Sequence, residues 1–135
     1  MTPLIAGGRA AHTLNLGLSG VKVDLIRYDY PLLEPLVQAH GYTLLALPDI
    51  AAMNLAAITN RGSKKDFVDL HFLLERYSIQ TLLDFHRRMF PDHDPFFVTR
   101  SLAYFDDSDT EPEPVMLREA SWGSVKEAVA RAVRA

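Results

Sequence analysis

The hydrophobic pattern of this chain changes its period once, at Pro48. Before that point, Val21–Arg27 alternates apolar and polar residues, as a strand with one buried face does. A looser alternation over Thr13–Leu18 precedes it, and the intervening Ser19-Gly20 is a turn signal, so the two runs predict a β-hairpin. After Pro48, apolar residues recur at helical spacing. The sequence therefore predicts an α+β fold, a small β element followed by a helical bundle.

Local signals divide the two halves into elements. A short helix or turn is predicted around Leu32–Val37, which Pro35 interrupts, and a short strand over Tyr42–Leu47. Proline and serine residues suited to helix starts predict helices over Pro48–Arg61, Ser63–Tyr77, Ser78 to about Phe90, Pro95–Phe105, and from Ser121 or Ser124 to the C-terminus. We expect one compact unit, with a β element over 1–47 and a helical domain over 48–135.

Composition narrows the class of protein. The 135 residues suit a domain of ordinary size, and 48% are hydrophobic, enough for a core. The net charge of −3 is too small to indicate nucleic acid by itself. The absence of cysteine excludes disulfides and zinc–thiolate sites and favours a cytoplasmic protein. No apolar run is long enough to span a bilayer, and we identify no signal peptide.

Asp24 is the first candidate for chemistry. It lies within the predicted strand, on the face opposite the valines. A carboxylate fixed on a strand is one way to hold Mg²⁺ for phosphoryl transfer, because Mg²⁺ prefers oxygen ligands. A single aspartate is more simply explained as a solvated polar residue on the outside of a hairpin.

A charged cluster follows at the start of the second predicted helix. Asp66 and Asp69 are three residues apart and share a helix face, and Lys65 is spaced to pair with Asp69. With Arg61 and Lys64 nearby, these cations and the free N–H groups of the helix start make a phosphate site plausible. The alternative is a structural role, in which Asp66 caps the helix and the other charges form ordinary ion pairs.

The remaining polar and aromatic residues indicate structure more than chemistry. The five histidines show no metal-ligand spacing, and His71 and His86 are expected on helix surfaces or in partly buried packing. The acidic run Asp106–Glu113 is expected to be a mobile, solvated loop. The aromatic residues near the C-terminus are expected in the core rather than on a stacking platform: Phe96, Phe97, Tyr104, Phe105 and Trp122.

Two stretches resemble a known family. They are VKVDLIRYDYPLLEPL, from Val21, and LPDIAAMNLAAITNRGSKKDFVDLHFLLERYS, from Leu47, and the later SLAYFDD is similar too. All three resemble the AbiEii nucleotidyltransferase toxins, the toxin component of type IV abortive-infection systems, over about four-fifths of the chain. The resemblance implies a partial nucleotidyltransferase sheet followed by helices, and metal-dependent transfer of a nucleotide to a tRNA or protein acceptor.

The resemblance also assigns residues. It implies that Asp24 is the later catalytic carboxylate and a Mg²⁺ ligand. It places Arg61, Lys65, Asp66 and Asp69 in the family's helical motif, whose charges lie near the nucleotide or tie the helices to the active site; we assign nucleotide phosphates to Arg61 and Lys65. Two departures weaken catalysis: no D-x-D pair precedes Asp24, and Asn54 stands where the family usually has lysine.

Three hypotheses follow from these residues. The chain is a truncated nucleotidyltransferase-like protein that is inactive alone, or a non-catalytic interaction or nucleotide-binding module, or a helical domain whose charged motif is structural. We expect a homo-oligomer, because an isolated hairpin leaves open strand edges and an uncovered apolar face. The further expected partners follow from the resemblance: a cognate antitoxin, a nucleoside triphosphate, and a tRNA or protein acceptor.

Overall fold

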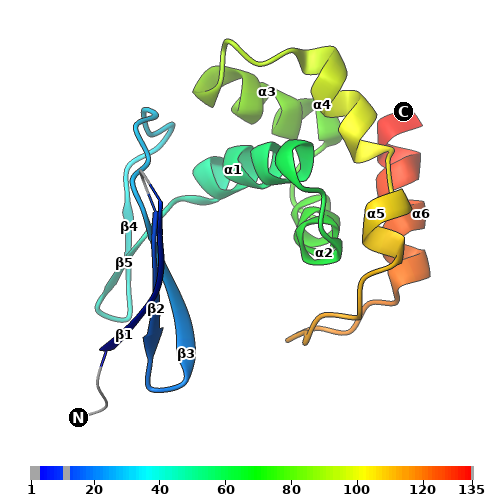
Figure 1. Cartoon of the computed structure of the whole chain (residues 1–135). Helices are drawn as coiled ribbons and strands as arrows, with labels where there is room; N and C mark the ends of the chain where they lie inside the picture. The colour runs from blue at the N-terminus through cyan, green and yellow to red at the C-terminus, as the bar shows by residue number, and fades with distance from the viewer. Residues whose placement is uncertain (1–3, 11–12, 135) are drawn as a thin grey trace. The chain divides into compact units, whose positions relative to one another are not determined.

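The computed structural model describes residues 4–10 and 13–134, with side chains from Leu14 onward. The fold is α+β, as predicted (Figure 1). It divides into two units, a sheet unit over Met1–Pro31 and a helical unit over Leu32–Ala135. The division lies after Pro31, whereas the sequence placed a boundary after Leu47 within one compact unit. The reason is that residues 32–46 belong with the helices that follow them.

The sheet unit is an antiparallel sheet of three strands, β1 (Leu4–Ala10), β2 (Thr13–Leu18) and β3 (Val21–Ile26), in the order β1-β2-β3. The β2–β3 hairpin confirms the prediction from alternation, and Ser19 and Gly20 turn it with φ of 52° and 77°. Strand β1 has no counterpart in the sequence prediction.

The register of the β2–β3 hairpin separates its two faces. The pairs Leu14↔Leu25, Leu16↔Val23 and Leu18↔Val21 put six aliphatic side chains on one face. The pairs Asn15↔Asp24 and Gly17↔Lys22 occupy the other, mainly polar face, which also carries Ile26 at its end. Asp24 thus lies on the face opposite the valines, as the alternation predicted.

A second hairpin opens the helical unit. Strands β4 (Val37–Ala39) and β5 (Tyr42–Leu44) pair across His40 and Gly41, whose φ angles are 51° and 81°. The segment before β4 is a turn rather than a helix. It is held by the buried carboxylate of Asp49, which accepts hydrogen bonds from the N–H groups of Leu33 at 2.7 Å and Glu34 at 3.1 Å.

Six helices follow among the described residues; five correspond to the predicted helices, and α5 was not predicted. They are α1 (Leu47–Asn60), α2 (Lys64–Leu73), α3 (Ile79–Met89), α4 (Pro95–Leu102), α5 (Asp106–Asp109) and α6 (Trp122–Arg134). Pro48 lies in the first turn of α1, and Ser63 and Ser78 cap α2 and α3. Helix α2 ends at Leu73, four residues before the predicted end at Tyr77.

Helix α1 is the centre of the helical unit. It contacts α2, α3 and α4, and α6 packs on α2 and α4 (Figure 1). The largest core cluster joins all of these helices and includes the fully buried Leu55, Phe67, Leu82, Leu102 and Val129. The α1–α2 turn is therefore fixed by packing on both of its helices. No helix among the described residues is long and apolar enough to cross a bilayer.

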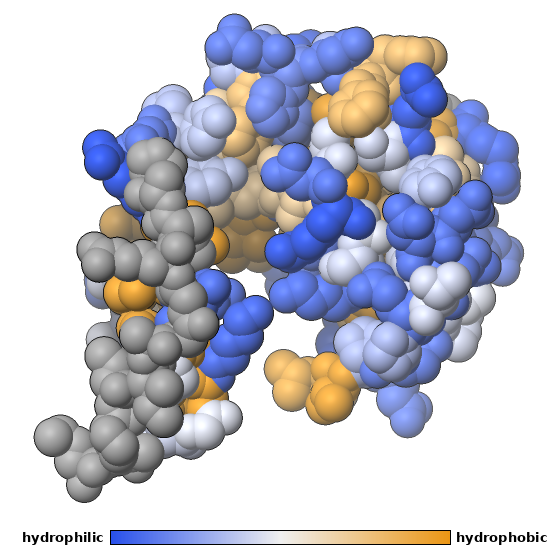
Figure 2. Space-filling model, in the orientation of Figure 1, coloured by the Kyte–Doolittle hydropathy of each residue, from blue (hydrophilic) through white to orange (hydrophobic). Residues whose placement is uncertain are grey.

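Two expectations about the C-terminal half were wrong in part. The acidic run is mostly exposed, as expected, but it is anchored: it begins with α5, and Asp109 accepts hydrogen bonds from Trp122 at 2.7 Å and Lys126 at 2.9 Å. Among the aromatic residues, Phe105 and Trp122 pack against the core, but Phe96, Phe97 and Tyr104 are exposed. Figure 2 shows this face of the helical unit as mostly hydrophilic, with small apolar patches.

Candidate functional site

The predicted helical motif lines one groove of the helical unit. The groove has a volume of about 530 Å³ and lies along α1 and α2. Five residues named from the sequence line it: Asn54, Arg61, Lys65, Asp66 and Asp69. Arg76, Glu75, Phe72 and Arg118 are among the other lining residues. The α1–α2 turn is what brings these positions together.

Asp66 and Arg61 form the fixed part of the groove. Both carboxylate oxygens of Asp66 accept hydrogen bonds from the Arg61 guanidinium, at 2.9 and 3.0 Å. Asp66 also accepts from the backbone N–H of Ser63 at 3.2 Å and from its hydroxyl at 2.7 Å, which completes a capping box. Burial raises the pKa of Asp66, but the bonds from Arg61 and Ser63 outweigh it and leave this pKa below its ordinary value. The same contact with Asp66 raises the pKa of Arg61.

Asn54 braces α1 against α2. Its side-chain amide donates a hydrogen bond of 3.0 Å to the backbone carbonyl of Asp66, and only 8% of the residue is exposed. Its Oδ1 is buried and has no hydrogen-bond partner among the described residues. Asn54 therefore helps to hold the turn that carries Asp66 and presents no positive charge to the groove.

Two cations of the groove have no directly bonded partner among the described residues, although the charge of Lys65 acts on Asp69 and that of Arg76 acts on Glu75. Within the described part of the chain, neither Lys65 nor Arg76 has a side-chain hydrogen bond or ion pair, so the predicted Lys65–Asp69 contact is not formed. Arg118, by contrast, is held by both oxygens of Glu75, at 3.0 and 3.1 Å. Desolvation and the nearby charge of Asp66 raise the pKa of Asp69, and the charges of Lys65 and Arg61 offset part of this rise. The groove thus combines held ion pairs with Lys65 and Arg76, which are available to an anion.

The N-terminal end of α2 is occupied by Glu111, a residue from a later segment of the same chain. The N–H of Lys64 donates a hydrogen bond of 2.7 Å to a carboxylate oxygen of Glu111, and the Lys64 ammonium donates one of 2.7 Å to the Glu111 carbonyl. Lys64 also lies over the Trp122 ring, 4.9 Å from its centroid. An acidic side chain therefore occupies the anion-binding helix end that the sequence suggested. Anion binding in the groove has to rely on side chains instead.

Asp24 belongs to the sheet unit, whereas the groove belongs to the helical unit. Its carboxylate lies 3.6 Å from the Lys22 ammonium. One carboxylate beside a lysine does not by itself fit Mg²⁺, which needs several oxygen ligands. Among the described residues, no group of three or more histidine, aspartate or glutamate side chains is placed to hold a metal ion. Mg²⁺ binding at Asp24, and the convergence of Asp24 with Arg61, Lys65 and Asp69, remain predictions.

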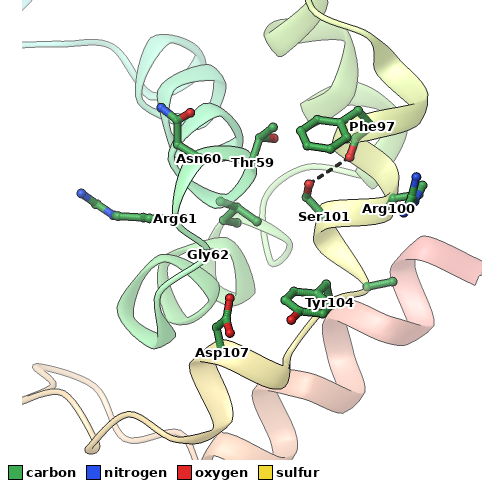
Figure 3. A pocket seen from close by; sticks show the side chains of 11 residues that line it. Thr59, Asn60, Arg61, Gly62, Phe97, Arg100, Ser101, Tyr104 and Asp107 are labelled. Carbon is green, nitrogen blue, oxygen red and sulfur yellow. Dashed lines mark hydrogen bonds between the residues drawn. The ribbon is translucent and has the colours of Figure 1, made fainter.

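A second cleft, not foreseen from the sequence, lies on the other side of the α1–α2 turn. It has a volume of about 450 Å³ between the end of α1 and helix α4, with Asp107 of α5 at its edge (Figure 3). Arg61 lines both the cleft and the groove. Phe97, Ser101 and Tyr104 recur at helical spacing along one side of this cleft. That spacing was the available signal, but it predicts a buried stripe just as readily as an exposed one.

Comparison with known proteins gives one relative. The chain is 34% identical over 126 residues to the uncharacterized protein aq_aa25 of Aquifex aeolicus (strain VF5), a match that covers 90% of this chain and 60% of the relative. The chain therefore spans about three-fifths of the length of that relative. No protein-family profile matches the chain, and no solved structure matches it.

Proposed function

We propose that this chain is a nucleotidyltransferase-like protein of the AbiEii kind, whose helical unit binds the phosphate groups of a nucleotide in the α1–α2 groove. The observation that carries the proposal is the gathering of Asn54, Arg61, Lys65, Asp66 and Asp69 on that one groove. These are the motif positions on which the resemblance rests. Their gathering is what a nucleotide site built from the motif requires.

Lys65 and Arg76 supply the attraction for phosphate in this proposal. Both line the groove without a side-chain partner among the described residues, so neither has to break an ion pair in order to bind. A hydrogen bond to a charged group contributes about 1.5–3 kcal/mol, and less at an exposed position. Arg61 is held by Asp66 in a fixed direction and therefore shapes the groove more than it binds.

Transfer of a nucleotide by this chain alone is not expected. Two-metal phosphoryl transfer uses several carboxylates to hold the ions against the triphosphate. Asp24 is a single carboxylate beside Lys22, Asp66 is committed to Arg61 and Ser63, and Asn54 is committed to the Asp66 carbonyl. Positioning supplies most of the catalysis in this reaction, so a loosely placed metal gives little rate.

The second candidate is a non-catalytic module that binds a nucleotide or a partner chain without turnover. The structural use of Asp66 and Asn54 favours it, because both side chains brace the α1–α2 turn. We propose homo-oligomers for either function. A cognate antitoxin and a tRNA or protein acceptor are further partners that the proposal includes.

Binding and transfer are tested separately. Calorimetric titration of the full chain with each of the four nucleoside triphosphates should show saturable binding that weakens at least about fivefold in Lys65→Ala and in Arg76→Ala. The matched control is Arg131→Ala, which removes an exposed cation of α6 outside the groove. Equal weakening in the control would contradict a specific groove.

The transfer test incubates labelled triphosphates, Mg²⁺ or Mn²⁺, and mixed tRNA with the chain. No label should enter the tRNA. Incorporation that disappears in Asp24→Ala would contradict the inactivity of the chain and would establish Asp24 as catalytic.

A further inference from the structure

The cleft between α4 and the end of α1 exposes two large aromatic residues. Phe97 of α4 is 51% exposed, and Tyr104, two residues beyond the end of α4, is 53% exposed; both line the cleft (Figure 3). Single exposed aromatic residues are common on protein surfaces, but two that line one open cleft give that cleft an apolar wall. Aromatic rings that line an open cleft are suited to stack on a flat ligand.

The opposite wall and the edge of the cleft carry two uncommitted polar groups. The Asn60 amide and the Asp107 carboxylate have no side-chain hydrogen bond or ion pair among the described residues. The hydroxyls nearby are already used, because Ser101 donates to the Phe97 carbonyl at 2.9 Å and Thr59 donates to the Leu55 carbonyl at 2.9 Å. Asn60 and Asp107 are therefore the groups available to a ligand.

The charges at the cleft restrict the chemistry of that ligand. Asp107 repels an anionic group but accepts hydrogen bonds from an amino group. The Arg61 side chain points away from the cleft (Figure 3), toward its bonds with Asp66. Arg100 also lines the cleft, and its guanidinium lies over the ring of Phe96, 5.9 Å from the centroid. The suitable occupant is thus flat, aromatic and amino-bearing, with its amino group toward Asp107.

We propose that this cleft is a nucleobase pocket, in which the base stacks on Phe97 and Tyr104 and its amino edge is bound by Asn60 and Asp107. The inference deepens the proposed function and rests on it for the phosphates, since Arg61 separates the pocket from the groove that contains Lys65. Adenine, cytosine and guanine carry the required amino group, whereas uracil and thymine do not. The base belongs to a free nucleotide or to a single strand of nucleic acid.

The experiment measures binding of the four ribonucleoside monophosphates and of four labelled single-stranded tetranucleotides, each of one base, to the full chain. Removing one stacking ring weakens binding about 5- to 100-fold, so we expect losses in that range for Phe97→Leu and Tyr104→Leu. Phe96→Leu is the matched control, because Phe96 is a 69% exposed ring on the same helix outside the cleft. Adenine and cytosine ligands should bind more tightly than uracil ligands, and Asp107→Ala should remove that preference.

The outcomes separate this inference from the proposed function. Weakening in Lys65→Ala without weakening in Phe97→Leu overturns the nucleobase pocket and leaves the phosphate groove standing. Weakening in Phe97→Leu without weakening in Lys65→Ala supports the pocket and overturns the groove. Equal losses in Phe96→Leu and Phe97→Leu, or no saturable binding by any ligand, overturn the pocket. Tighter binding of the tetranucleotide than of the matching monophosphate assigns the base to a strand, and the reverse assigns it to a free nucleotide.

Discussion

The guanidinium of Arg61, just beyond the end of α1, donates two hydrogen bonds to the carboxylate of Asp66 in the first turn of α2. Gly62 lies between them with a φ of 56°, and a Cβ there would lie 3.2 Å from the Ile58 carbonyl. The ion pair and the tight turn together fix the angle between α1 and α2. The groove and the cleft both depend on that angle, because both are lined by the turn.

Removal of the Asp66 carboxylate should destabilise the helical unit. Asp66→Ala loses the capping box of α2 and its bonds with Arg61, a cost of about 1–3 kcal/mol in the free energy of unfolding. Asp69→Asn is the control; it should change this free energy by less than about 0.5 kcal/mol, because Asp69 caps nothing. The measurement is urea unfolding followed by fluorescence of Trp122, the single tryptophan, which packs in the helical unit. Equal destabilisation by the two variants would contradict the capping role.

Removal of the Asp49 carboxylate should loosen the contact between α1 and the segment before β4. Asp49→Ala leaves the N–H groups of Leu33 and Glu34 without their acceptors, each lost bond costing about 0.5–1.5 kcal/mol. Amide hydrogen exchange at Leu33 and Glu34 should accelerate, while exchange in the middle of α2 stays unchanged. Unaltered exchange at both amides would show that other contacts hold this segment.

The free energy of unfolding should decrease as the pH falls from 6.5 to about 4, because of His86. The side chain is buried on α3, and desolvation, followed by the charge of His93, lowers its pKa from 6.5 to about 4. The unfolded chain then takes up a proton between pH 6.5 and about 4 that the folded chain does not, so stability decreases as pH falls through this window. The lowered pKa of Asp66 adds a separate loss only below 3.8.

Urea midpoints measured between pH 7 and pH 4 check this prediction. His86→Leu should flatten the decrease within the window, whereas His93→Gln, which alters an exposed neighbour, should retain most of it. A His86→Leu slope equal to that of the unmodified chain would contradict the assignment.

The sheet unit should drive self-association. Its hairpin gathers Leu14, Leu16, Leu18, Val21, Val23 and Leu25 on one face, and Leu18, Val21 and Leu25 are 44–60% exposed. Light scattering at tens of micromolar protein should show a dimer or larger species that Val23→Lys dissociates. Lys22→Gln, on the polar face, is the control and should leave the assembly intact. A monomer at that concentration would count against the prediction.

Local sequence signals correctly predicted the elements whose formation depends on neighbouring residues. Alternation and a turn dipeptide located the β2–β3 hairpin, and Pro48, Ser63 and Ser78 located three helix starts. Strand β5 lies within the predicted strand Tyr42–Leu47, but β4 and its pairing were missed, because the turn uses His40 in a left-handed conformation that the sequence does not indicate. Helix α5 was missed because long-range contacts hold its four residues, among them the bonds of Asp109 to Trp122 and Lys126.

The candidate site, too, was predictable only where it depends on local sequence. Spacing within α2 anticipated the cap by Asp66, and the motif anticipated that Lys65 and Asp69 share a surface with Arg61. No local pattern reveals that Glu111, 47 residues after Lys64, occupies the start of α2. Exposure of Phe97 and Tyr104 was equally hidden, because it depends on how far the end of α1 stands from α4.

The most direct test of the phosphate groove is amide chemical-shift mapping of the isotope-labelled full chain during titration with ATP. The account predicts saturable shifts concentrated in the first turns of α2 and near Arg76; these shifts disappear in Lys65→Glu and persist in Arg131→Glu. Shifts that are absent, that map only to the sheet unit, or that survive unchanged in Lys65→Glu would contradict it.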